Sequence, residues 1–168
     1  MKDINDRNFG LIIAFWLPGF ILLWGLSFSF ASLEPWMIKS NSSDGATFTG
    51  FLYATVASLS LGLVISAVRW LVVDHFLGWL TTLKKIDFAK IESNKDAFAY
   101  FQGVVENHYR YYQYYSNTLV AVDLAAVVHI WYGRETLPWQ AWVGLVLISL
   151  ILLCASRDAL RKYHDRSP

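Results

Sequence analysis

A carboxylate stands in the middle of an apolar segment of this chain, where charged side chains are rare. Asp123 lies near the centre of the segment 116–132. An ionised carboxylate facing lipid at that depth costs about 3 kcal/mol on insertion scales, so it must face protein or water, be paired, or be protonated. Its candidate roles are a pore or gate charge, an ion filter or a proton relay. A contact that fixes helix packing is the structural alternative. Arg69 is the nearest cation, although we expect its side chain to extend to the cytoplasmic headgroups.

His129 is the second titratable side chain of the same segment. It follows Asp123 by six residues, which corresponds to about 600° of helix and leaves the two side chains about 120° apart. A relay between them would therefore require neighbouring copies of the chain. We retain His129 beside Asp123 as a candidate pore or gate residue. The structural alternative is a satisfied group within a belt of interfacial Trp and Tyr side chains.

An aromatic and basic collar precedes this segment and reads His-Tyr-Arg-Tyr-Tyr-Gln-Tyr-Tyr over residues 108–115. Aromatic planes beside arginine supply the stacking surfaces and phosphate contacts that a nucleotide or a single-stranded oligonucleotide requires. A membrane-interface belt, with nearby lysines on anionic lipid, is the structural alternative. The candidate ligand-binding residues are Tyr109, Arg110, Tyr111, Tyr112, Lys84 and Lys85.

Long apolar segments must position these residues. Of the 168 residues 55% are hydrophobic and 16% are charged, against about 25% charged in an ordinary soluble domain. Runs of about 18 or more apolar residues indicate membrane-spanning helices. The expected spans are 9–33, 51–73, 116–132 and 137–156. The first run is too long for the apolar core of a signal peptide, so we expect it to be retained. The sequence predicts an all-α chain that forms a single membrane domain over residues 1–168.

The lysine and arginine residues indicate how the spans are oriented. If both termini and the segment 74–115 share one side, that side carries twelve Lys and Arg residues, counting Arg69 near the end of its span, and the other side carries two, Lys39 and Arg134. Cytoplasmic loops carry the excess of Lys and Arg, so both termini should be cytoplasmic. Between residues 92 and 132 there is no proline and one glycine, Gly103. We therefore expect a cytoplasmic helical segment within 74–115 that continues into a long, projecting third helix.

Two further patterns concern how the spans pack. Small residues recur at four-residue steps in the second span, a spacing that lets helix backbones approach closely. They are Ala54, Ser58, Gly62 and Ser66. A narrow wet path along the serines is the alternative. In the first span, Pro18 and Gly19 predict a kink, because proline removes a backbone hydrogen bond. A carbonyl freed at membrane depth then needs another partner.

Enzyme motifs are lacking. The sequence contains no G-x-S-x-G, H-E-x-x-H, C-x-x-C or phosphate-binding glycine-rich loop, and its one cysteine is Cys154. We therefore expect no enzymatic activity, no metal and no cofactor.

Three short motifs connect the chain with a known type of membrane protein. They are Arg7-Asn8-Phe9-Gly10, Leu17-Pro18-Gly19-Phe20 and the His-Tyr-Arg-Tyr-Tyr-Gln element at 108–113. On these the chain resembles small bacterial four-helix membrane effectors of anti-phage defence, specifically the channel effectors of Hailong-type systems. The resemblance would cover most of the chain. It implies an oligomeric channel that an oligonucleotide from a partner nucleotidyltransferase holds shut, and that opens on infection to depolarise the cell.

Our leading hypothesis is therefore a homo-oligomeric ion channel or depolarising effector in the bacterial inner membrane, gated from the cytoplasm by a nucleotide or oligonucleotide. Its pore would form between copies, in contact with membrane lipid. One alternative is a small proton-coupled transporter with Asp123 as its titrating site. The other is a membrane scaffold subunit that docks a cytoplasmic protein partner through the segment 74–115.

Overall fold

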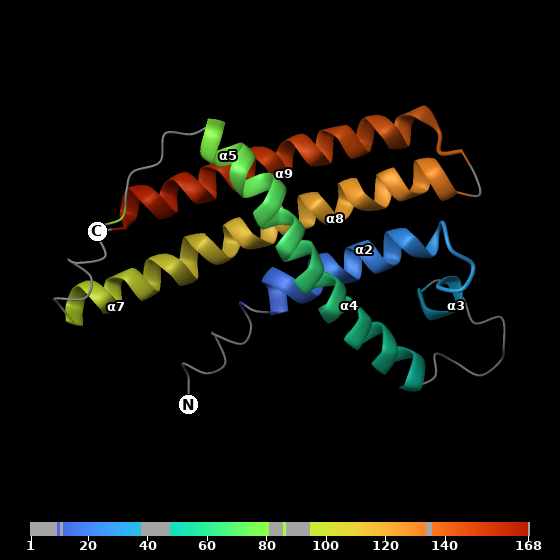
Figure 1. Cartoon of the computed structure of the whole chain (residues 1–168), viewed down its shortest axis with the longest axis horizontal. Helices are drawn as coiled ribbons and strands as arrows, with labels where there is room; N and C mark the ends of the chain where they lie inside the picture. The colour runs from blue at the N-terminus through green and yellow to red at the C-terminus, as the bar shows by residue number, and fades with distance from the viewer. Residues whose placement is uncertain are drawn as a thin grey trace.

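The chain folds into helices. The computed structural model describes residues 10, 12–37, 48–80, 86, 95–133 and 136–167, and every regular element among them is helical. The predicted all-α class is confirmed for this part of the chain. In chain order, with η marking a one-turn π-helix, the elements are η1 (Ile12–Trp16), α2 (Leu17–Ser27), α3 (Glu34–Met37), α4 (Phe48–Arg69), η2 (Trp70–Asp74), α5 (His75–Leu80), α7 (Lys95–Val104), η3 (Val105–Tyr109), α8 (Arg110–Tyr132) and α9 (Trp139–Arg166). Figure 1 labels the α-helices.

Several of these elements join end to end. α4, η2 and α5 form one uninterrupted helix, and α7, η3 and α8 form another, from Lys95 to Tyr132. The second helix contains no proline, so no residue in it lacks the N–H that helical bonding needs. It ends where the backbone of Gly133 becomes extended and its N–H donates to the His129 carbonyl at 2.8 Å. The residues 95–115 thus continue the axis of the apolar segment well beyond it.

Two helices are long and apolar enough to cross a membrane. They run over Gly50–Gly78 and Trp139–Arg166, and only 28% and 17% of their most apolar 18-residue windows are buried. Their apolar side chains therefore point mainly outward, unlike those of a core helix in a soluble protein. Ile12–Ser27 is a shorter apolar helix, so the first expected span ends earlier than residue 33. The third expected span lies in α8, which is not among the two.

Contacts between small residues bring α2 against two neighbours. A Cβ added at Gly19 would overlap the Ser58 carbonyl oxygen of α4, and one added at Gly62 would overlap the Phe15 carbonyl oxygen. On the other side, a Cβ at Gly25 would lie 2.6 Å from the Ala125 Cβ of α8. In the small-residue series of α4, Ala54, Ser58 and Gly62 are buried and Ser66 is partly buried. The series therefore lies at the α2–α4 contact, where it allows close packing.

A π-helical turn, η1, precedes the proline of the first apolar helix. Pro18 lies in the first turn of α2 and lacks the N–H that would otherwise bond to the Ala14 carbonyl. That carbonyl instead accepts a hydrogen bond from Asn117 Nδ2 of α8 at 2.7 Å. The freed backbone group is therefore satisfied by a neighbouring helix, as a buried backbone carbonyl requires.

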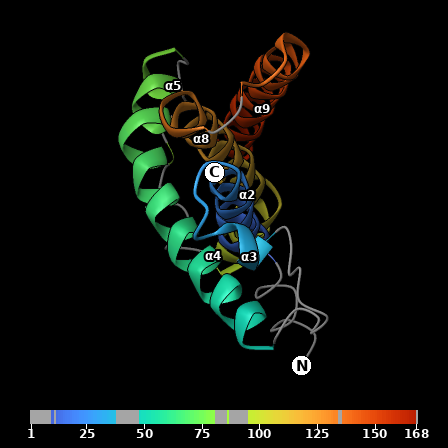
Figure 2. The ribbon, with the colours of Figure 1, turned by 90° about the vertical axis from the view of Figure 1, so that its right-hand side faces the viewer.

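The core lies where the helices cross. Leu22, Ile65, Tyr112, Ala121 and Leu160 belong to one buried cluster that joins α2, α4, α8 and α9. Figure 2 shows α4 and α5 along one flank, α2 and α8 in the middle, and α9 leaning away on the other side. Because the helices diverge from this crossing, large parts of α4 and α9 are not buried by the other described helices.

Candidate functional site

Asp123 lies on the outer surface of the protomer. Its side chain is exposed, and its Oδ1 accepts a hydrogen bond from Ser149 Oγ of α9 at 2.7 Å. Around this pair the surface is apolar, with Val127, Val146 and Ile130 each about half exposed or more. The hydroxyl and the carboxylate therefore form an isolated polar patch in an otherwise apolar face, which we call the Asp123–Ser149 patch.

Sequence reasoning missed Ser149. It is the one polar side chain in the run 143–153, and that isolation is the only signal that could have drawn attention to it. The pairing with Asp123 depends on the angle at which α9 packs on α8, which the sequence alone does not reveal.

Arg69 does not extend to the headgroups as expected. It is 4% exposed, and its Nη1 lies 3.3 Å from Asp74 Oδ1. The two residues are five apart, and on a regular α-helix they would not share a face. The turn between them is η2, a π-helix with i→i+5 bonding, which brings positions five apart together. Arg69 therefore forms its ion pair with Asp74 of the same helix and is not the partner of Asp123.

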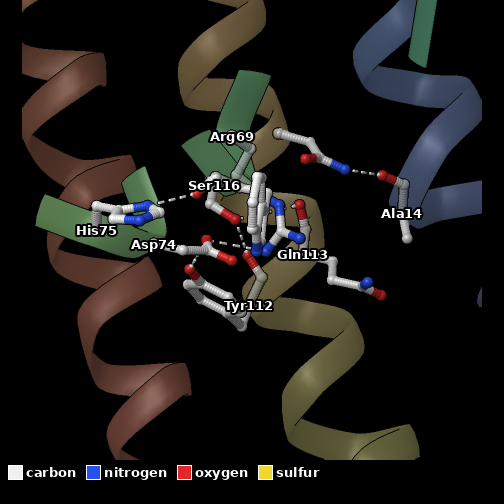
Figure 3. A network of polar contacts seen from close by, with 9 residues as sticks. Ala14, Arg69, Asp74, His75, Tyr112, Gln113 and Ser116 are labelled. Atoms are coloured by element: carbon white, nitrogen blue, oxygen red, sulfur yellow. Dashed lines mark hydrogen bonds and ion pairs between the residues drawn. The ribbon is translucent and has the colours of Figure 1, made fainter. Parts of the chain in front are cut away.

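Tyr112 completes this buried cluster, as Figure 3 shows. Its hydroxyl donates a hydrogen bond to Asp74 Oδ1, and the Arg69 Cζ lies 5.2 Å from its ring centroid. Ser116 Oγ donates to the Tyr112 carbonyl at 2.5 Å. At 1% exposure Tyr112 offers no face to a ligand, so the candidate ligand residue belongs to the core instead. We call Arg69, Asp74 and Tyr112 the buried triad.

The rest of the collar divides into inward and outward parts. Tyr109 is partly buried, with its ring centroid 5.0 Å from that of Tyr163 in α9. Arg110 is mostly buried, pairs with Glu106 at 3.7 Å and packs against Gly10. Tyr111 is 51% exposed and stacks on Tyr115 at 6.3 Å between ring centroids. Lys84 and Lys85 lie outside the described residues. Of the collar candidates on α8, Tyr111 is therefore the exposed aromatic face.

A polar contact ties the start of the collar to the end of α9. Arg166 Nη1 lies 2.8 Å from His108 Nε2. Because the guanidinium can only donate, Nε2 acts as the acceptor and the imidazole is neutral in this contact. Partial burial, and then the charges of Arg166 and Lys162, lower the pKa of His108 from its ordinary value. The contact therefore favours neutral His108.

His129 faces away from Asp123. It lines a cavity of about 620 Å³ between α2, α8 and α9, together with Trp24, Glu34 and Leu145. Asp123 is not part of that lining, which agrees with the wide angle expected between the two side chains. Within one protomer the two candidate pore residues therefore occupy different surfaces.

We searched the described residues for a metal site and compared the chain with known proteins. Among the described residues, no three His, Cys, Asp or Glu side chains gather in a way that could hold a metal ion. Comparison with protein-family models, curated proteins and solved structures found no match to the chain. Inferences about function therefore rest on the residues themselves.

Proposed function

We propose that this chain is the subunit of a homo-oligomeric ion channel of the bacterial inner membrane, with four spans and both termini in the cytoplasm. The observation that carries the proposal is the exposure of Asp123 on a protomer whose surrounding surface is apolar. In a bilayer, a lone protomer would present this carboxylate to hydrocarbon. Sister copies around a hydrated axis remove that cost, because the carboxylate then faces water.

The outward-facing surfaces of α4 and α9 support assembly in the same way. Neither helix is buried over most of its apolar length, so both have faces available for lipid and for neighbouring copies. Four short spans in a protomer of 168 residues leave little room for a water-filled path inside it. The described cavity beside His129 is mostly apolar and is a poor route for ions. The path is therefore assigned to the interface between copies.

Gating is assigned to the cytoplasmic end. The long helix from Lys95 to Tyr132 connects the collar directly with Asp123, without a loop between them. A nucleotide or an oligonucleotide stacked on Tyr111 would act on this helix. The resemblance to anti-phage channel effectors supports the same arrangement, with depolarisation of the infected cell as the outcome.

The proposal is tested with purified protein. The particle mass in detergent should correspond to several copies, and reconstitution into planar bilayers should give single-channel currents. Asp123→Asn should change the unit conductance and leave the particle mass unchanged. Asp158→Asn is the matched control, because Asp158 is an exposed acid of α9 that pairs locally with Lys162 at 2.6 Å.

Two other results would contradict the channel, and a third would contradict only the role of Asp123. A monomeric particle without current would end it. Proton-driven substrate uptake in vesicles without passive current would favour the transporter. A retained current with unchanged conductance in Asp123→Asn would remove Asp123 from the path.

A further inference from the structure

We infer that the path conducts cations in preference to anions, and that the Asp123–Ser149 patch, repeated by each copy around the axis, is the selectivity filter. The inference rests on the proposed function and deepens it, because it names the class of ion. It depends on which charges remain on the surface at membrane depth and on the chemistry of the atoms that carry them.

Few charged residues lie within the expected spans. Across the four expected spans there are two formally charged residues, Arg69 and Asp123. An oligomeric pore lined by these segments can therefore take its fixed charge from one or the other. The sign of the filter follows from which of the two faces the outside of the protomer.

Arg69 is withdrawn from that surface. It is 4% exposed, forms its ion pair with Asp74 and lies against the ring of Tyr112. Its positive charge is thus largely compensated inside each subunit. Asp123 is exposed, and its described contact is with a neutral hydroxyl, Ser149, so its negative charge is not cancelled. The net fixed charge at this depth is negative, which raises the local concentration of cations.

The atoms of the patch suit the same class of ion. Each copy presents the carboxylate oxygens of Asp123 and the hydroxyl oxygen of Ser149, 2.7 Å apart at the closest pair. Hard cations such as K⁺ and Na⁺ take oxygen ligands, whereas an anion would need N–H donors or cationic side chains at this level. Rings of carboxylates are the filters of cation channels. Several copies would close such a ring.

The first test measures reversal potential in reconstituted wild-type protein under a tenfold KCl gradient. We expect permeability for K⁺ over Cl⁻ by about tenfold or more, equivalent to about 1.4 kcal/mol of discrimination. Asp123→Asn should bring the ratio close to one, and the control Asp158→Asn should leave it at the wild-type value. A wild-type current selective for Cl⁻, or an Asp123→Asn current as selective for K⁺ as the wild type, would overturn the inference.

A second test leaves Asp123 in place, so its outcome does not depend on whether the Asp123→Asn variant assembles. The test uses the double variant Ser149→Cys, Cys154→Ala. Cysteine is close in size to the serine it replaces, and the second change removes the native thiol, so that the reagents modify position 149 alone. Modification with an anionic methanethiosulfonate reagent should maintain or raise the preference for K⁺, and a cationic reagent should lower it at least about tenfold. An unchanged ratio after complete modification by both reagents would contradict the filter.

The two proposals fail in different ways. If no current is measured from any preparation, the channel itself is wrong and the filter with it. If current is present but its selectivity is indifferent to Asp123 and Ser149, the channel stands and the filter is wrong. Absence of modification at Ser149→Cys by either reagent, with current present, would place the patch against lipid and likewise exclude the filter.

Discussion

Asn117 of α8 donates its side-chain N–H to the carbonyl of Ala14, the group left without its usual helical partner by Pro18. The contact joins α8 to the π-helical turn η1 at a distance of 2.7 Å and is fully buried on the Asn117 side. One hydrogen bond therefore both satisfies the backbone group freed by Pro18 and joins α8 to the start of the first apolar helix.

We predict that Asn117→Ala destabilises the protein by about 1–3 kcal/mol, because it leaves a buried carbonyl unsatisfied. Pro18→Ala restores an N–H near the same carbonyl, so the two changes should not be additive. The loss caused by Asn117→Ala should be smaller in the Pro18→Ala background. Unfolding in mixed detergent micelles would measure this double-mutant cycle, and strictly additive losses would show that Asn117 does not compensate for the proline.

Substitutions in the buried triad should lower the free energy of unfolding, more for Asp74 than for Tyr112. Asp74→Ala leaves the Arg69 guanidinium buried without its counter-charge, which should destabilise by about 3–5 kcal/mol. Tyr112→Phe removes one hydrogen bond to a carboxylate, a loss of about 1.5–3 kcal/mol. The same unfolding assay applies. Asp158→Asn, in an exposed pair, should change stability by less than about 1 kcal/mol. A smaller loss for Asp74→Ala than for Tyr112→Phe would contradict the ion pair.

Glycine substitutions should separate a close helix contact from an open surface. Gly62→Ala would push a methyl group into the Phe15 carbonyl, so we expect a loss of about 1–3 kcal/mol from forced separation of α2 and α4. A Cβ at Gly78 meets nothing within 4 Å, so Gly78→Ala should be neutral or stabilising by about 0.5–1 kcal/mol through its helix propensity. A loss of thermal stability in Gly62→Ala without a loss in Gly78→Ala would support this contact, and equal effects would argue against it.

The His108–Arg166 contact predicts a pH dependence of stability. The pKa of His108 is lowered in the folded protein from its ordinary value of 6.5, so the unfolded chain binds the proton more readily. The stabilising contribution should therefore be fully present above about pH 6.5, the ordinary pKa. It should be lost as the pH falls from that value toward the lower pKa of the folded protein. His108→Gln should flatten this part of the profile. A wild-type stability that rises as the solution is acidified across the same range would show the opposite shift.

If a nucleotide or oligonucleotide binds at the collar as proposed, we predict that it stacks on the exposed face of Tyr111. Protein purified from its native host should carry material absorbing at 260 nm, and Tyr111→Ala should reduce it, because stacking contributes about 1–3 kcal/mol per base. Tyr53→Ala is the matched control, since Tyr53 is a 59% exposed tyrosine near the start of α4, away from the collar. The absorbance ratio at 260 and 280 nm is read on the oligomeric peak. Equal ratios in both variants and the wild type would remove Tyr111 from the ligand site.

The sequence was sufficient for the helical class and for the close packing of small residues, because both follow from local composition and spacing. It was insufficient for the buried triad. Arg69 and Asp74 meet through a π-helical turn, and an α-helical wheel separates them. Tyr112 appeared to be one of several equivalent tyrosines, and only the crossing of α4 over α8 selects it for the core. The Asp123–Ser149 contact likewise depends on the angle between α8 and α9, which no periodicity encodes.

The helices α8 and α9 are connected to each other at both ends. At one end Gly133 follows α8 and Pro138 precedes α9 in the chain, and at the other end Tyr109 packs on Tyr163 while His108 meets Arg166. Between these two connections both helices are continuous, so neither contains a flexible segment that could absorb a displacement of its end. Under the gating proposed above, a ligand bound at the collar would act on both helices together and change their tilt at the level of Asp123.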